Sequence, residues 1–129
     1  MRVATLLALF VATSLPARAQ TYTGYASIYA TGVMEAVSRH RGLPVVPCMI
    51  ATPLVARVGV WVSVTSGVTG ERLRCRTTDV VHPRDQAAHL RTRHYVEFDN
   101  RSGRRMCRVR YAGQQPRRAC PVTITEGVP

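Results

Sequence analysis

A run of alternating residues over positions 58–65 constrains the fold of this chain most strongly. Valine occupies every second position from Val58 to Val64, and glycine, tryptophan, serine and threonine fill the positions between and after. A period of two is that of a β-strand with one buried face. Ser66–Gly70 (SGVTG) then predicts a turn, and Glu71–Thr78 predicts a returning strand. The segment is therefore expected to form a β-hairpin.

Further strand patterns precede and follow this hairpin. They cover Tyr22–Tyr29, His94–Asp99 and Pro121–Glu126, and short helical segments are expected near Gln86–Leu90 and Ser102–Cys107. Five or six strands with one or two short helices are typical of an all-β domain, either a small closed barrel or a sandwich.

The first nineteen residues have the three parts of a secretory signal peptide. Arg2 gives the positive start, Val3–Leu15 is apolar, and Ala17-Arg18-Ala19 is a small-x-small cleavage site. Thirteen helical residues span about 20 Å, less than the hydrocarbon core of a bilayer. We therefore expect cleavage, in preference to an uncleaved anchor, and a secreted or periplasmic domain over residues 20–129 without a transmembrane segment.

Four cysteines remain in that domain: Cys48, Cys75, Cys107 and Cys120. An even number in an oxidising compartment predicts two disulfides, for which three pairings are possible. We favour Cys48–Cys75 and Cys107–Cys120, since each closes a local loop between segments that resemble adjacent strands. The alternative is a metal site, but no C-x-x-C occurs and the histidines are scattered, so neither a metal nor a cofactor is expected.

The charge of the domain is strongly positive. All eighteen basic residues are arginine, and removal of the signal peptide leaves sixteen of them against seven carboxylates, a formal charge of +9. Such a field attracts polyanions. In an exported protein these are cell-wall glycans or other anionic polymers and not nucleic acid, and the domain is expected to be a monomer.

Two sets of side chains on the predicted strands are candidate binding groups. Arg72, Arg74 and Arg76 form a stripe on the outer face of the hairpin, which is either a solvated face or a contact surface. The aromatic residues Tyr25, Tyr29 and Trp61 either stack on sugar rings or belong to the core.

Asp79 is the strongest candidate for a catalytic group. It ends a predicted strand where the chain enters a long polar loop, next to Thr77, Thr78 and His82. A carboxyl that is half removed from water can act as a general acid. The alternative is that Asp79 caps the turn through downstream backbone N–H groups.

The order of several motifs resembles that of the rare lipoprotein A-like double-psi β-barrels, which are related in fold to barwin and to expansin-type domains. The matching segments are Gly24–Tyr29 (GYASIY), Gly59–Thr65 with Gly70, Cys75–Pro83 (CRTTDVVHP) and Tyr95–Asp99 (YVEFD). The resemblance implies a six-stranded double-psi β-barrel that binds cell-wall polysaccharide, and some members are lytic transglycosylases that cut peptidoglycan.

The resemblance also implies roles for individual residues. Asp79 matches the Asp that follows the family's strand, Glu97 lies where a later Asp is found, and Glu35 lies near an early acidic residue. Pro53 stands where the cleaving members carry a His, and His82 is the residue that could replace it.

Three functions follow as hypotheses. The first is a secreted barrel that binds peptidoglycan or another anionic glycan around Asp79. The second is a lytic transglycosylase in which Asp79 is the general acid and base. The third is an effector or inhibitor module that presents its arginine stripe to a protein partner.

Overall fold

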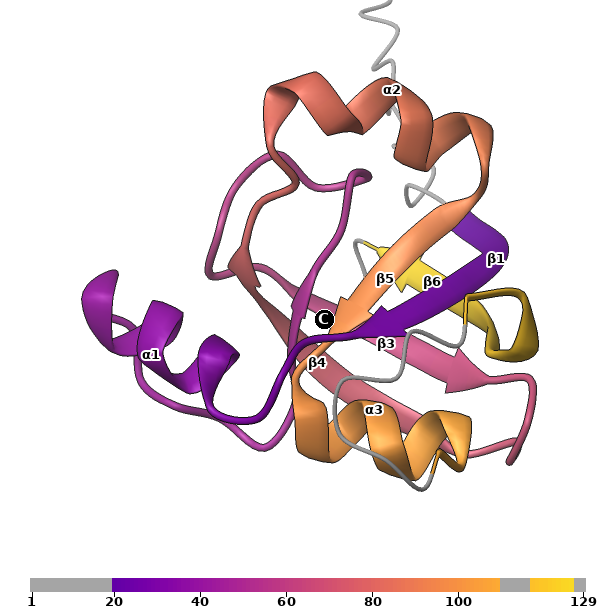
Figure 1. The fold of residues 1–129 in the computed structure, drawn as a ribbon, viewed down its shortest axis with the longest axis horizontal. Helices are drawn as coiled ribbons and strands as arrows, with labels where there is room; N and C mark the ends of the chain where they lie inside the picture. Colours follow the sequence, from indigo (N-terminus) through magenta and orange to yellow (C-terminus); the bar gives the residue numbers. More distant parts are fainter. Residues whose placement is uncertain (1–19, 110–116, 127–129) are drawn as a thin grey trace, which may run out of the picture.

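The computed structural model describes residues 20–109 and 117–126, so the expected signal peptide lies outside the described residues. Six strands close into a barrel in the order β1-β5-β2-β4-β3-β6. Figure 1 shows the ribbon of this barrel. The strands are β1 (Gln20–Ile28), β2 (Met49–Ala51), β3 (Trp61–Ser66), β4 (Arg72–Asp79), β5 (His94–Phe98) and β6 (Pro121–Glu126). The small six-stranded barrel expected from the sequence is confirmed.

The predicted hairpin is present as β3 and β4. Its antiparallel register pairs Val62 with Cys75 and Val64 with Leu73. Val62 and Val64 are buried, as the alternation predicts. The pairs Trp61–Arg76, Ser63–Arg74 and Thr65–Arg72 make up the other face.

Closure of the barrel depends on strands that are distant in sequence. β1 runs parallel to β5 and antiparallel to β6, while the three-residue β2 joins β4 and β5. The interior contains Phe98 with Ile28 and Ile50 on the strands beside it, all at most 1% exposed. Burial of such side chains contributes about 2 kcal/mol each.

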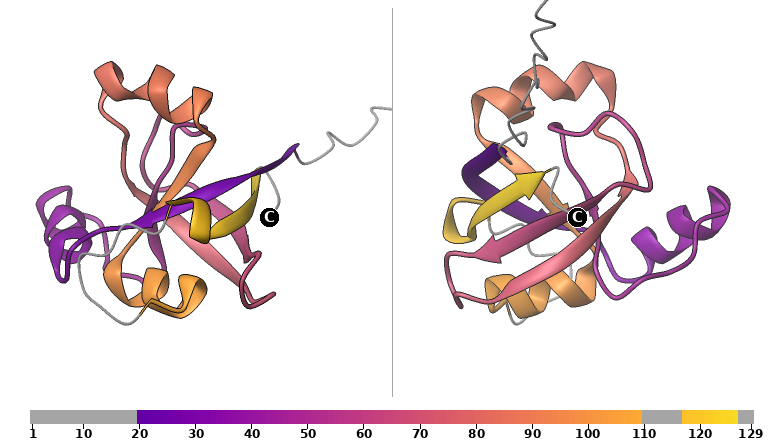
Figure 2. Two further views of the ribbon diagram at one scale, coloured as in Figure 1. Left: turned by 45° about the vertical axis from the view of Figure 1, so that its right-hand side comes forward. Right: turned by 180° about the vertical axis from the view of Figure 1, so that it is seen from behind.

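Three short α-helices surround the barrel. They are α1 (Val33–His40), α2 (Pro83–Arg91) and α3 (Asn100–Cys107). The views in Figure 2 agree that α2 and α3 cover opposite ends of the barrel and that α1 stands to one side. α2 and α3 include the two helical segments expected from the sequence, whereas α1 was not expected.

The helix α3 is fixed to the barrel by Asp99, its N-cap. Asp99 is 2% exposed, and its Oδ1 accepts a hydrogen bond from Ser102 N while its Oδ2 accepts one from Met49 N of β2. Gly103 allows the helix to approach β1, because a Cβ there would lie 2.6 Å from Cγ1 of Ile28. A larger residue at this position would force α3 away from the core.

Both favoured disulfides are present. Cys48–Cys75 links the residue before β2 to β4, two segments that run side by side, whereas Cys107–Cys120 links the end of α3 to the residue before β6. The second bond therefore ties a helix to a strand, not strand to strand. Two disulfides in so small a domain are typical of an oxidising compartment.

None of the helices in residues 20–109 and 117–126 is long and apolar enough to cross a bilayer.

Candidate active site

Asp79 and Glu97 lie on two strands that flank β2. Ala51 of β2 is the register partner of Asp79 in β4 on one side and of Glu97 in β5 on the other. Register partners place their side chains on the same face of a sheet. The neighbour of Glu97, Phe98, belongs to the core, so this is the outer face. Within the sheet, Ala51 separates the two residues, whose Cα atoms are two strand spacings apart, about 10 Å.

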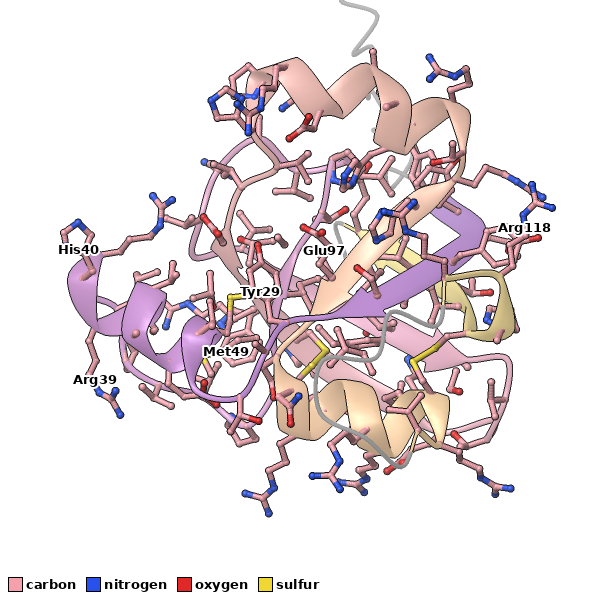
Figure 3. All side chains as sticks on the ribbon, in the orientation of Figure 1. Tyr29, Arg39, His40, Met49, Glu97 and Arg118 are labelled. Atoms are coloured by element: carbon pink, nitrogen blue, oxygen red, sulfur yellow. A yellow bond between two sulfur atoms is a disulfide. The ribbon has the colours of Figure 1, made fainter. Side chains whose placement is uncertain are left out.

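Tyr29 connects the two carboxyl groups. It follows β1, and its hydroxyl donates a hydrogen bond to Asp79 Oδ2 at 3.1 Å and also interacts with the Glu97 carboxyl. Figure 3 shows Tyr29 and Glu97 near the centre of the molecule below α2. Desolvation, followed by the two nearby carboxyl groups, raises the pKa of Tyr29. Its hydroxyl therefore remains a protonated donor across the physiological pH range.

Asp79 accepts two further hydrogen bonds on its other oxygen. Arg41, the C-cap residue of α1, places Nη2 at 2.8 Å from Oδ1, and Val80 N donates to the same atom at 2.9 Å. The charged guanidinium and two additional donors suit an ionised carboxylate. The hydrogen bond from Val80 N is the one expected of a turn cap. The side chain of Asp79 therefore caps the turn and also belongs to the candidate site.

The carboxyl group of Glu97 has a different environment. Desolvation raises the pKa of Glu97, and the negative charge of Asp79 adds to this. His89, Arg117 and the Tyr29 hydroxyl act in the opposite direction, but burial outweighs them. The two carboxyl groups thus differ: Asp79 is paired with a cation, while burial makes ionisation of Glu97 less favourable than in water.

Two histidines lie next to Glu97. The rings of His89 in α2 and His94 in β5 stack at 4.3 Å with an interplanar angle of 18°. His94 is 5% exposed, and its Nε2 shares a 2.6 Å hydrogen bond with Ser27 Oγ. Desolvation, then His89 and Arg117, lower the pKa of His94 to about 4, so the buried ring is neutral at pH 7.

His89, His94 and Glu97 also provide the donor types that bind zinc. One ligand atom from each lies within 4.8 Å of the others, a grouping that the scattered histidines of the sequence did not suggest. The lone pair of an imidazole lies in the plane of its ring, so those of two stacked rings run side by side and do not converge on one point. Joint ligation of a metal therefore requires a rotation of His89.

The predicted arginine stripe forms a separate surface with Trp61. The guanidinium carbons of Arg74 and Arg76 lie 5.6 and 5.8 Å from the centroid of the Trp61 ring, which is 37% exposed. Arg72 continues the stripe on β4. Cation–π contacts of this kind keep the indole in place, and its exposed part is accessible to a ligand.

Tyr25 lies beside a cavity and not on a flat strand face. The guanidinium of Arg93 covers its ring at 5.3 Å from the centroid. The cavity, which has a volume of ≈ 540 Å³, also reaches His94. The predicted aromatic groups Tyr25, Tyr29 and Trp61 therefore belong to three different environments.

His82 and Glu35 are positioned by other contacts. His82 is the N-cap residue of α2, where its Nδ1 accepts a hydrogen bond from Arg84 N at 3.2 Å. Glu35 on α1 lines a different cavity, together with Asn100 and Arg101 of α3. His82 therefore caps α2, and Glu35 shares its cavity with arginines of α3.

Sequence reasoning missed Arg41, His89 and the buried role of His94. Arg41 belongs to a helix whose N-cap, Gly32, makes no side-chain hydrogen bond, so no capping motif indicated it. His89 lies in α2 and His94, five residues later, lies in β5, so no helical or strand period relates the two histidines. A fold was needed to bring them together.

No protein family, curated protein or solved structure matches this chain.

The chemistry of the site therefore rests on its own geometry. A carboxyl group with a raised pKa and an ion-paired carboxylate on one face are the arrangement of a general acid and a base or charge-stabilising group. Glycoside cleavage uses such a pair. A tyrosine hydroxyl between them fixes their relative position.

Proposed function

We propose that this chain binds an anionic cell-wall glycan and cleaves its glycosidic bonds, with Glu97 as the proton donor and Asp79 as the charged partner. The observation that carries the proposal is the Tyr29 hydroxyl, which joins an ion-paired Asp79 to a desolvated Glu97. The sequence suggested Asp79 as the acid; the environments of the two groups favour the opposite assignment.

The reaction requires two proton transfers, one from the protein to the glycosidic oxygen and one from the attacking hydroxyl to the protein. Glu97 gives its proton to the glycosidic oxygen, the bond from that oxygen to the anomeric carbon breaks, and the electron pair remains on the leaving oxygen. Asp79 stabilises the positive charge that develops on the sugar and accepts the proton of the attacking hydroxyl. Water as the nucleophile gives a reducing end, whereas a hydroxyl of the same sugar gives an anhydro end.

The choice of polymer is supported by features outside the site. The expected signal peptide and the two disulfides fit a protein that acts outside the cytoplasm, and a formal charge of +9 favours an anionic polymer. The resemblance to rare lipoprotein A-like barrels points to peptidoglycan.

Binding without cleavage is the second candidate. It is favoured by the surface formed by Trp61 with Arg74 and Arg76, which offers both an aromatic ring and positive charge. In this case the Asp79–Tyr29–Glu97 cluster would only position the ends of the strands.

Digestion of purified sacculi tests the proposal. Residues 20–129, with both disulfides formed, are incubated with sacculi, and the released fragments are identified by mass spectrometry. We expect wild type to release fragments, and Glu97→Gln and Asp79→Asn to release about a hundredfold less. Glu126→Gln at the end of β6 is the matched control and is expected to keep wild-type activity.

Equal release by wild type and Glu97→Gln overturns the catalytic assignment. A wild-type protein that pellets with sacculi but releases nothing also overturns it and supports binding alone.

A further inference from the structure

A cavity next to the catalytic cluster is lined by four arginines. Its volume is ≈ 540 Å³, and Tyr25 and His94 contribute to its wall. The arginines come from three segments: Arg91 at the end of α2, Arg93 before β5, and Arg117 and Arg118 in the 3₁₀ helix η1 (Arg117–Ala119).

None of these four arginines forms an ion pair with a carboxylate in residues 20–109 and 117–126. The arginines that do so in these segments are Arg41, Arg84 and Arg105. Four guanidinium groups around one cavity repel one another, and the field they create attracts a negatively charged ligand. Guanidinium groups are well suited to bind carboxylates through paired hydrogen bonds.

The backbone at Arg93 fixes one wall of this cavity. Arg93 follows Thr92, the C-cap of α2, and has a φ of 56°, the left-handed conformation that commonly ends a helix. Its carbonyl accepts a hydrogen bond from Tyr25 N at 2.8 Å, and a Cβ on Gly24 would lie 2.3 Å from that oxygen. β1 and the end of α2 thus hold Arg93 next to Tyr25.

The cavity lies close to the proposed active site, because a ring nitrogen of His94 lies within 4.8 Å of a Glu97 carboxylate oxygen. His94 lines the cavity and stacks on His89, and both His89 and Arg117 act electrostatically on Glu97. A sugar bound with its anionic group in the cavity would therefore have the rest of its strand beside Glu97. In Figure 3 Arg118 lies at the outer edge of this side, across the molecule from Arg39 on α1.

We infer that this arginine cavity is a subsite for the carboxylate of an acidic sugar in the bound glycan. This inference rests on the proposed function, because it names the substrate class of the same site. It predicts that the carboxylate, more than the sugar backbone, determines affinity.

Two glycans separate these contributions. Tetrasaccharides of alternating N-acetylglucosamine and N-acetylmuramic acid carry lactyl carboxylates, whereas chitotetraose has a similar β-1,4-linked backbone without them. Binding is measured by titration calorimetry at moderate salt, with Glu97→Gln in every protein so that no cleavage occurs. We expect the acidic tetrasaccharide to bind about tenfold more tightly than chitotetraose, as charged hydrogen bonds allow.

The double variant Arg91→Gln/Arg118→Gln is expected to lose this tenfold preference and to keep its affinity for chitotetraose. The control Arg39→Gln/Arg57→Gln removes the same charge at exposed positions outside the cavity and should retain the preference. Equal losses in the two double variants would show that only net charge matters and would overturn the subsite. Tighter binding of a poly(glycerol phosphate) of equal charge would overturn its assignment to a carboxylate.

The result does not depend on cleavage. If the wild-type protein cleaves no glycan, the proposed reaction fails but the preference for the acidic tetrasaccharide is still measured. If the preference is absent, the subsite fails and the cleavage result stands.

Discussion

Arg41 Nη2 lies 2.8 Å from Asp79 Oδ1, so the end of a helix fixes the carboxylate at the end of a strand. The side chains of Arg41 and Asp79 are 36% and 20% exposed, respectively. A partly solvated pair of this kind contributes less than about 1 kcal/mol to stability. Its main effect is therefore expected on the position of the Asp79 carboxylate and not on the stability of the fold.

Arg41→Gln is expected to reduce glycan release about tenfold. Without the guanidinium the Asp79 carboxylate loses the charge-assisted hydrogen bond that holds it in place. The rate is measured as glycan fragments released per unit time. Arg39→Gln on the same helix is the control, and an unchanged rate in Arg41→Gln would contradict a positioning role for this ion pair.

Tyr29→Phe removes the hydroxyl between the two carboxyl groups and retains the ring. We expect a loss of activity of about ten- to a hundredfold, with a loss of about 1 kcal/mol in stability. Because the hydroxyl lowers the pKa of Glu97, its removal should raise that pKa further. Tyr22→Phe, whose hydroxyl contacts Gln20, is the control. Full activity in Tyr29→Phe would show that the hydroxyl is dispensable.

The strands were predictable because their signal is local. The alternation that ends at Val64 and the turn at Ser66–Gly70 determine the hairpin, and β6 begins and ends where the sequence indicated. β2 was not predicted, since three residues are too few to show a period. α1 was missed for a similar reason: of its residues only Met34 and Ser38 are buried.

The site was only partly predictable because it depends on barrel closure. Asp79 was found from its place at a strand end, and Glu97 only through the family resemblance. That both pair with Ala51 follows from the order β5-β2-β4, which no local pattern contains. Tyr29 was predicted either to stack on a sugar or to belong to the core, and its contact with Asp79 arises from two segments that are fifty residues apart.

His94 makes stability depend on pH in the acid range. Burial lowers its pKa in the folded protein to about 4, below the ordinary histidine value of 6.5. The neutral ring therefore stabilises the fold fully above pH 6.5, and about 3 kcal/mol is lost as the pH falls to about 4, since the unfolded chain takes up the proton first.

The free energy of unfolding in urea, measured between pH 7 and pH 4, tests this effect. His94→Gln does not titrate and is expected to show a smaller decrease than wild type. His40→Gln, at the exposed end of α1, should keep the wild-type slope. His89 and Arg117 are present in all three proteins, so equal slopes would contradict a desolvated His94.

Removal of the disulfides should destabilise the domain to different extents. The bonds span 13 residues in Cys107–Cys120 and 27 in Cys48–Cys75. By loop entropy, replacement of each pair by serine costs about 3 and about 3.5 kcal/mol, respectively. Urea unfolding of the two double variants measures this, and a cost near zero for either pair would contradict its role in stability.

The ionisation of Glu97 is the central claim, and carbon-13 NMR of its side-chain carboxyl measures it without any substrate. A titration of the protein with both disulfides formed, assigned by comparison with Glu97→Gln, should give a pKa above the ordinary glutamate value of 4.5. This value should rise further in Tyr29→Phe. A Glu97 carboxyl that titrates at or below 4.5 would contradict its role as the proton donor.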